Sequence, residues 1–375
     1  MPAPSSPTPP IRRRRLLQGG GLLLTSLLPG MGRAQPALAV PRFAAAWDDA
    51  ESRHFVGLLT AAREPTGRLE VLASIELPSR AHGLVWEPGG TLLASARRPG
   101  DWLLRWSPQG GKPQWRWSEP DRRFTGHTLR DPAGELLYSV ETDLESGQGL
   151  VVMRDLKTLA VKAEWPTHGI DPHQLIWGAD GRLLVANGGV PSMPETGRVK
   201  RELARMDSSL VRLERASGKL LGQWRLPDPR LSIRHLAKDA AGRVGIALQA
   251  EHDDAAAKAA APVLAIFDGQ ALRLGAAPQA LAGYGGDVAA TGDGFAVSVP
   301  RAGGVARWSA SGEWRGLEML AEACALAGAE SGGGPGAGWW AGGLSEARCH
   351  AADGTTTAYP LPALRLDNHW VRFSA

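Results

Sequence analysis

The amino-acid sequence predicts an all-β fold built from repeated units, because two markers recur along the chain. The first marker is a histidine that stands seven or eight residues before a turn glycine, and this glycine opens an apolar run. Four such runs occur, at residues 91–94, 135–138, 182–185 and 243–246. A repeat of about 45 residues is typical of a β-propeller, in which each blade is a four-stranded sheet.

The second marker is a short turn between two strand-like runs, which is the signal of a β-hairpin. Seven such turns occur, at residues 65–67, 109–111, 157–158, 217–219, 268–270, 311–313 and 353–355. Seven hairpins predict a seven-bladed β-propeller of four-stranded antiparallel blades.

The two ends of the repeating region predict how the ring closes. Residues 42–47, 54–60 and 68–77 are strand-like and precede the first histidine, whereas residues 367–373 have no hairpin after them. The C-terminal run is therefore expected to be the innermost strand of the first blade, beside residues 42–47. This closure would remove the exposed edges of the sheet.

Residues 1–39 have the features of an export signal. Arg12 to Arg15 precede a short apolar stretch, and Ala37-Leu38-Ala39 provides a cleavage site of small residues. Arg13-Arg14 fits the twin-arginine pattern, and the apolar stretch is too short to span a bilayer. We expect a twin-arginine signal peptide at residues 1–39 and a single propeller domain at residues 40–375. The alternative is an uncleaved membrane anchor.

The charge of the chain argues against nucleic-acid binding. Residues 1–39 hold five of the 42 basic side chains and none of the 38 acidic ones, so the remainder has 37 basic and 38 acidic groups. No basic surface is then expected on the mature protein. We expect a periplasmic monomer without a stable membrane span after processing.

The two cysteines are predicted to be unpaired, although the expected compartment is oxidising. Cys324 falls in the predicted inner strand of the last complete blade, and Cys349 falls in its third strand. Strands two places apart lie about 9–10 Å from each other, which is too far for a disulfide.

Several motifs of the chain resemble an exported bacterial family known as domain of unknown function 1513. They lie at residues 167–175, 186–190, 195–198, 206–210, 232–236 and 298–301. The resemblance implies a seven-bladed propeller of the quinoprotein/YVTN type and brings no established activity. It further implies periplasmic partners of the imelysin-like or dihaem peroxidase-like type, and a role in iron or other metal handling. The sequence departs from the family after Cys324, where Ala325 replaces the usual glycine, and at residues 332–338.

Five histidines occupy one register of the repeat, and they are the main candidates for a functional site. A position that repeats in sequence also repeats around the propeller axis, so these side chains should gather at one end of the channel. Neutral imidazole is a ligand for iron, copper and zinc. The predicted metal ligands are His82, His127, His173, His235 and His369. The structural alternative is that each histidine donates to a carbonyl of the next blade.

Three of the five histidines are the leading candidates for metal ligands, and three residues of other types are further candidates. We expect the nearest neighbours His82, His127 and His173 to form the leading triad, because opposite blades should lie too far apart. Further candidates for the metal site are Cys324, Glu141 and Asp287. The other four histidines fall outside the register and are expected at the surface or in loops; they are His54, His168, His252 and His350.

Two other functions remain open from the sequence. In a lactonase-like hydrolase, His173, His235 and Glu141 would act as general base and acid. Arg234, Arg301 and Asn187 would then contact an anionic substrate. No motif for a nucleophile or for phosphate binding is present. In a non-catalytic scaffold, the inserted residues 190–209 would dock a partner protein.

Overall fold

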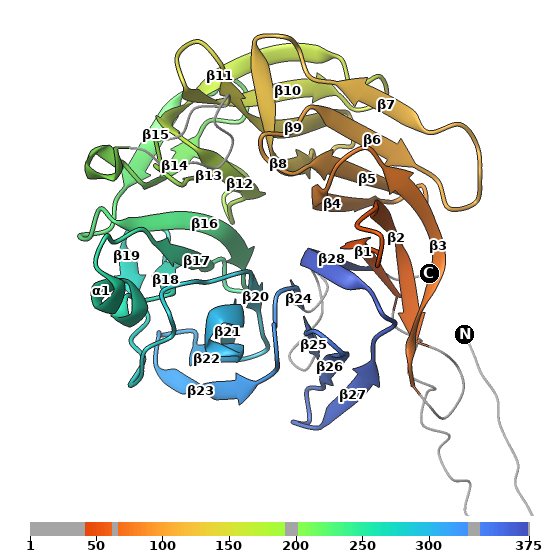
Figure 1. Cartoon of the computed structure of the whole chain (residues 1–375). Coiled ribbons are helices and arrows are strands. Elements are labelled where there is room, and N and C mark those ends of the chain that lie inside the picture. Colours follow the sequence, from red (N-terminus) through yellow and green to blue (C-terminus); the bar gives the residue numbers. More distant parts are fainter. Residues whose placement is uncertain (1–41, 62–66, 192–201, 329–337, 374–375) are drawn as a thin grey trace, which may run out of the picture. The chain divides into compact units, whose positions relative to one another are not determined.

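The computed structural model describes residues 42–61, 67–191, 202–328 and 338–373, and these form an all-β unit. Its strands make five four-stranded antiparallel sheets and one eight-stranded sheet, arranged around a central axis (Figure 1). This confirms the predicted all-β class with four-stranded antiparallel sheets.

Each four-stranded sheet is formed by four strands that follow one another in the chain. The first sheet contains β4 (Ala81–Glu87), β5 (Thr91–Ala96), β6 (Trp102–Trp106) and β7 (Gln114–Trp117). The second contains β8 (Arg122–Arg130), β9 (Leu136–Asp143), β10 (Gln148–Asp155) and β11 (Val161–Ile170). The third contains β12 (Pro172–Trp177), β13 (Leu183–Asn187), β14 (Ser209–Leu213) and β15 (Leu220–Trp224). The fourth contains β16 (Leu231–Lys238), β17 (Val244–Ala250), β18 (Leu264–Phe267) and β19 (Leu272–Leu274). The fifth contains β20 (Val288–Ala290), β21 (Gly294–Val299), β22 (Gly304–Ser309) and β23 (Trp314–Met319).

The eight-stranded sheet joins the two ends of the chain. Its N-terminal strands are β1 (Arg42–Asp48), β2 (His54–Ala61) and β3 (Leu69–Leu77). Its C-terminal strands are β24 (Leu326–Ala327), β25 (Trp339–Gly342), β26 (Glu346–His350), β27 (Thr356–Pro360) and β28 (Arg365–Phe373). β28 pairs antiparallel with β1, with Arg42 opposite Phe373. A parallel bridge between Leu326 and His369 connects β28 to β24.

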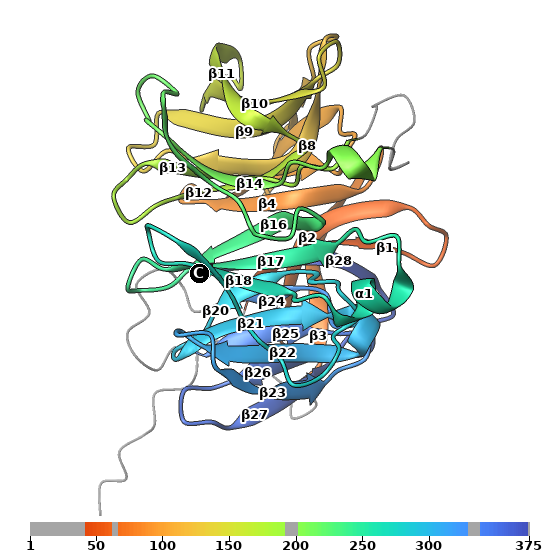
Figure 2. The same cartoon turned by 90° about the vertical axis from the view of Figure 1, so that its left-hand side faces the viewer.

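In each four-stranded sheet the first strand lies on the inner side, next to the axis, and in the eight-stranded sheet β24 and β28 lie there (Figures 1 and 2). These inner strands contact one another in the order β28, β4, β8, β12, β16, β20 and β24. A residue at one register of an inner strand therefore faces the same region as its equivalents in the other sheets.

The turn glycines that mark the repeat have the backbone conformation that the pattern requires. Gly90, Gly134, Gly181 and Gly242 precede the second strands of their sheets and have φ between 72° and 84°. Other residues rarely adopt this left-handed region, because Cβ clashes with the backbone there. The four glycines thus fix where each second strand begins.

The hydrophobic core lies between neighbouring sheets. Leu77 and Val56 of the first chain segment pack with Leu92 and Trp102 of the next sheet. Leu184 of β13 packs in the same way with buried residues of β16 and β17. Each sheet therefore stabilises its neighbour through buried apolar surface.

Regular helix is confined to short segments between strands in the described residues. They are α1 (Ala255–Ala260) and the 3-10 turns η2 (Leu203–Arg205) and η3 (Pro300–Ala302). Asp254 caps α1 by accepting from the Ala257 backbone amide at 2.7 Å. No described helix is long and apolar enough to cross a membrane.

Two predicted segments lie wholly or partly outside the described residues, whereas both cysteines lie within them. The signal at residues 1–39 lies outside the described residues, as do residues 192–201 of the insertion at residues 190–209. Cys324 and Cys349 are both free, which confirms that they do not form a disulfide.

Glu141 belongs to an ion-pair network within its own sheet, so its assignment to the metal site is wrong. Its side chain is fully buried, and its Oε1 accepts from Arg154 Nη2 at 2.8 Å and from Ser139 Oγ at 2.5 Å. Arg154 also donates to Glu119 Oε2 at 3.0 Å, and its guanidinium lies 5.1 Å from the centre of the Phe124 ring. Burial raises the pKa of Glu141, and the charge of Arg154 opposes this shift.

We predict that Arg154→Met lowers the free energy of unfolding by about 3–5 kcal/mol, because it leaves the Glu141 carboxylate buried without its cation. Chemical denaturation followed by tryptophan fluorescence measures this loss. The control is Arg315→Met, which removes an exposed contact of 3.4 Å to Glu313 and should change stability by less than about 1 kcal/mol. Equal losses in the two variants would show that the Arg154 network does not stabilise the sheet.

Candidate metal centre

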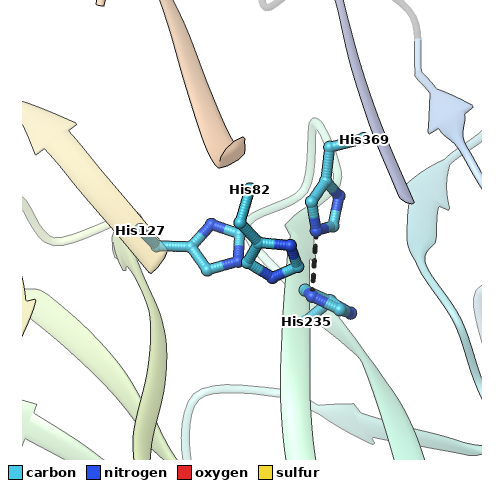
Figure 3. Close-up of side chains that lie close together, drawn as sticks. All are labelled: His82, His127, His235 and His369. Atoms are coloured by element: carbon cyan, nitrogen blue, oxygen red, sulfur yellow. Dashed lines mark hydrogen bonds between the residues drawn. The ribbon is translucent and has the colours of Figure 1, made fainter. Parts of the chain in front are cut away.

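The five histidines predicted from the repeat come together on the inner strands. All are buried, and none of these residues is more than 9% exposed. The centres of the contacting rings lie 4.4–5.7 Å apart. Figure 3 shows four of them pointing toward one another from different strands. The predicted convergence on one region of the axis is confirmed.

A shared backbone irregularity aims these side chains. In each case the register between the inner strand and its neighbour shifts across the histidine. Such bulges bend a strand and redirect a side chain away from the regular alternation. The residues that lie within these shifts are His82, His127, His173, His235 and His369.

Two glycines allow the first two histidines to approach each other. A Cβ on Gly83 would lie 2.2 Å from the carbonyl oxygen of Gly126. Gly126 has φ of 118°, and a Cβ there would lie 2.6 Å from Cδ2 of His82. Strands β4 and β8 therefore need glycine at both positions to bring His82 and His127 together.

The ring nitrogens of the histidines are close enough to share a ligand. One ligand atom from each of His82, His127, His235 and His369 lies within 4.8 Å of all the others. His235 Nε2 also lies 2.8 Å from His173 Nε2 and 3.0 Å from His369 Nε2. The expected triad of His82, His127 and His173 is therefore not the observed set of close ligand atoms, which includes His235 and His369. The channel is slim enough for His235 to reach across it.

Asp287 fixes the ring of His369. Its Oδ2 lies 3.1 Å from His369 Nδ1, and it also accepts from the Leu326 backbone amide at 3.1 Å. A carboxylate at Nδ1 holds the proton there, which leaves the lone pair of Nε2 free for a ligand. Asp287 therefore contacts the Nδ1 side of His369 and is not a member of the four-histidine group.

Several ring nitrogens of the cluster have no hydrogen-bond partner among the described residues. Both nitrogens of His82 are in this state, together with Nε2 of His127 and Nδ1 of His173 and of His235. A buried polar atom without a partner costs about 1–3 kcal/mol. Such atoms are common at sites that bind a ligand.

Four of the five imidazoles are held neutral, which is the form that binds metals. Burial lowers the pKa of His82, His127, His173 and His235 well below the usual value of 6.5. Neighbouring histidines add to this effect, because each protonated ring would repel the next. The cluster therefore resists protonation at neutral pH.

The distances fit a metal ion. Histidine nitrogens bind transition metals at about 2.0–2.1 Å, so two co-ligands lie roughly 2.9–3.4 Å apart. The contacts of His235 with His173 and His369 fall close to this range. The Nε2 atom of a neutral His235 has either one proton or one lone pair, so it cannot make two good hydrogen bonds, one to His173 and one to His369. A cation, in contrast, can accept the lone pairs of neighbouring Nε2 atoms.

A cavity of about 230 Å³ opens beside the cluster. Its lining includes three of the histidines, His82, His173 and His235. The rest of the lining is rich in polar groups and in arginine; it comprises Arg97, Arg98, Pro99, Arg123, Phe124, Thr125, Thr142, Asp171, Val190, Gln249, Tyr284, Arg301 and Asn368.

The remaining predicted site residues divide between this cavity and the protein interior. Arg301 lines the cavity as expected, with its guanidinium 4.2 Å from the centre of the Tyr284 ring. Arg234 is fully buried, and its Nη1 lies 2.7 Å from Asp171 Oδ2. Asn187 is also fully buried and donates to the carbonyl of Thr167 at 2.9 Å. Neither Arg234 nor Asn187 is part of the cavity lining.

Cys324 is not in the four-histidine group. Burial and the neighbouring carboxylates, Asp367 first among them, raise the pKa of its thiol to about 11. A protonated thiol is a poor metal ligand. The sequence-based suggestion that Cys324 joins the site therefore finds no support in this geometry.

The four histidines outside the register include one that was placed wrongly. His54 pairs with Asp48 at 2.7 Å, and His252 pairs with Asp228 at 2.9 Å. His168 is exposed, as expected. His350, in contrast, is buried in β26 and stacks on Trp339 with 3.9 Å between ring centres.

Sequence reasoning named Arg301 but missed the other three arginines of the cavity. Arg97 and Arg98 follow β5 directly, and Arg123 lies in β8 ahead of Gly126. Each occupies a different register of the repeat, so no periodic signal groups them. The adjacent pair Arg97-Arg98 after an apolar run was the only visible hint.

Comparisons place the chain among proteins of known fold but without assigning an activity. The family model described as "Protein of unknown function (DUF1513)" matches residues 75–373. No curated protein is significantly similar to the chain.

Solved structures resemble the chain at low identity. A Bacteroides fragilis protein described as a candidate 6-phosphogluconolactonase has a TM-score of 0.57 at 13% identity, covering 91% of this chain and 100% of its own. Streptogramin B lyase has a TM-score of 0.53 at 12% identity, with 75% and 83% covered. The RRP9 WD40 repeats have a TM-score of 0.54 at 12% identity, with 79% and 84% covered. These likenesses show a β-propeller fold.

We predict that the metal-free protein loses stability as the pH falls below 6.5. Unfolded imidazoles take up protons near pH 6.5, whereas the buried ones have lowered pKa values and do not. Each such histidine then contributes up to about 1.4 kcal/mol of lost stability per pH unit below this value. Thermal melting of chelator-treated protein between pH 7.5 and 5.0 measures the slope.

The matched variants for this experiment are His82→Gln and His252→Gln. The first removes a buried titrating ring and should flatten the pH dependence, while the second changes a histidine outside the cluster and should leave it unchanged. An unchanged slope in His82→Gln would show that the cluster is not the source of the pH dependence.

Proposed function

The chain belongs to the DUF1513 family, and we propose that it is an exported β-propeller that binds a transition metal through its central histidine cluster. The observation that carries the proposal is the meeting of five buried imidazoles, four of which have a ring nitrogen without a hydrogen-bond partner among the described residues. Nitrogens 2.8 Å and 3.0 Å apart have the spacing of co-ligands on one ion.

The donor set selects the class of metal. The four-histidine group offers only imidazole nitrogen, with no carboxylate and no thiolate in it. Imidazole suits iron, copper and zinc, whereas calcium and magnesium prefer oxygen. In a titration, the affinity should rise from Fe²⁺ to Cu²⁺ and be lower for Zn²⁺ than for Cu²⁺.

The cellular role that we propose follows from the N-terminal sequence and from the family resemblance. Residues 1–39 direct export by the twin-arginine route, and the mature protein acts in the periplasm. There it serves iron or other metal handling, with imelysin-like or dihaem peroxidase-like proteins as partners. The sequence features given above support this role.

We also propose a seven-bladed arrangement for the propeller. The eight-stranded sheet divides at the single parallel bridge between Leu326 and His369. One half holds β24 to β27, and the other holds β28 with β1 to β3. Together with the five four-stranded sheets they make seven blades, with β28 as the strand that closes the ring.

A hydrolase is the second candidate function, because His173 and His235 line a cavity together. Their neutral rings could accept a proton from water. Glu141, the acid expected from the sequence, is engaged by Arg154 and takes no part. The lactonase-like and lyase-like neighbours support only the fold, because their identities are 12–13%.

We predict that the wild-type protein binds about one transition-metal ion per chain and that His82→Gln combined with His235→Gln abolishes this binding. Elemental analysis after exposure to Zn²⁺ or Cu²⁺ and desalting measures the stoichiometry. The control combines His54→Gln with His252→Gln, which changes two histidines outside the cluster. Equal metal content in the two double variants would remove the basis of the proposal.

We further predict that Asp287→Asn weakens metal binding about tenfold or more, because the His369 ring loses the carboxylate that fixes its proton. Competition with a chromophoric chelator measures the affinity. The matched control is Asp228→Asn, which changes the carboxylate that contacts His252. Full affinity in Asp287→Asn would mean that His369 is not a ligand in this form.

A further inference from the structure

The cavity beside the histidine cluster carries more positive charge than its own acids neutralise. Four arginines line it, and Asp171 is its one acidic lining residue. The formal surplus is therefore three positive charges. Because like-charged guanidinium groups around one cavity repel one another, such a surplus favours an anion in the same space.

The acidic groups near the cavity are already shared between arginines. Asp171 contacts both Arg98 and Arg234. Asp367 contacts both Arg80, at 3.0 Å, and Arg97, at 3.7 Å. Each of these carboxylates thus serves two guanidinium groups and leaves no spare charge for the others.

Two of the lining arginines have no acidic partner within 4 Å in the described part of the chain. Arg123 donates to the backbone carbonyl of Arg122 at 2.6 Å. Arg301 lies over the face of Tyr284, and its side chain is exposed at the cavity. A guanidinium has five N–H groups, so both arginines keep donors for an incoming oxyanion.

The rest of the lining suits a small polar molecule. Thr125, Thr142, Gln249 and Asn368 add donors and acceptors around the arginines. A volume of about 230 Å³ accommodates a small organic anion and excludes a protein segment or a nucleic acid.

We propose that this cavity binds a small polycarboxylate, held by Arg123 and Arg301 and lying against the histidine cluster. A tricarboxylate matches the surplus of three charges, and carboxylates pair with arginine in a bidentate fashion. The proposed binding of the anion depends on the arginines and does not require a metal ion. Its second role, to supply an oxygen ligand to the ion on His82 and His235, rests on the proposed metal function.

The first arm of the test uses the full chain freed of metal. Isothermal titration with tricarballylate, a tricarboxylate that chelates metals weakly, should show one binding site that weakens with added salt. Arg123→Gln and Arg301→Gln should each weaken binding about tenfold or more, because each removes a charged hydrogen-bond donor. The control is Arg315→Gln, at an exposed position of β23, which should bind as the wild type does.

Two further probes define the chemical class. Butyrate, with one carboxylate, should bind far more weakly than tricarballylate. Inorganic phosphate should also bind more weakly. No binding of tricarballylate by the wild type, wild-type affinity in both arginine variants, or a preference for phosphate would overturn the proposed polycarboxylate site. Since the two variants are tested separately and checked by melting temperature, failure of one to fold leaves the other decisive.

The second arm uses protein loaded with Zn²⁺. Bound zinc should strengthen tricarballylate binding about tenfold, and His127→Gln combined with His369→Gln, two cluster positions outside the cavity lining, should abolish this gain while keeping the metal-free affinity. If the wild type binds no zinc, the metal function fails, and the anion site is still judged by the metal-free titration. If zinc binds without any gain in anion affinity, the second role of the anion is wrong.

Discussion

The desolvation of five imidazoles at the axis is the constraint on which the rest of the site depends. Their rings are buried, and several nitrogens have no partner in the described residues. Regular strand pairing is interrupted to place them there, because a register shift occurs at each of the five histidines. Glycines at positions 83 and 126 remove the side chains that would hold β4 and β8 apart. These costs are understandable if the cluster binds an ion.

The charges around the cluster form layers. Burial disfavours a positive charge on four of the imidazoles, and Asp287 contacts the fifth, His369, at 3.1 Å. The arginines come next around the cavity, with Asp171 and Asp367 each shared between two of them. A metal ion alone would add positive charge to this region, so an anion in the cavity and an ion on the histidines would stabilise each other.

The repeat made most of the fold and the cluster predictable from the sequence. Turn glycines such as Gly90 mark where second strands begin, and a constant offset from them placed His82 and its equivalents on the inner strands. Glu141 was misplaced because a strand turns alternate residues to opposite faces, and this residue faces Arg154 inside its sheet. The sequence did not predict that Arg123 and Arg301 line one cavity, because the packing of different sheets brings them there. The reach of His235 across the axis likewise depends on the channel width, which no local pattern specifies.

The measurement that tests the metal centre most directly is anomalous X-ray scattering from crystals of the zinc-loaded protein, recorded on both sides of the zinc absorption edge. The account predicts one strong anomalous peak about 2.0–2.1 Å from the Nε2 atoms of His235 and His369 and within bonding distance of His82 or His127. A crystal with no such peak, or with zinc only at surface histidines such as His54 or His252, would contradict it.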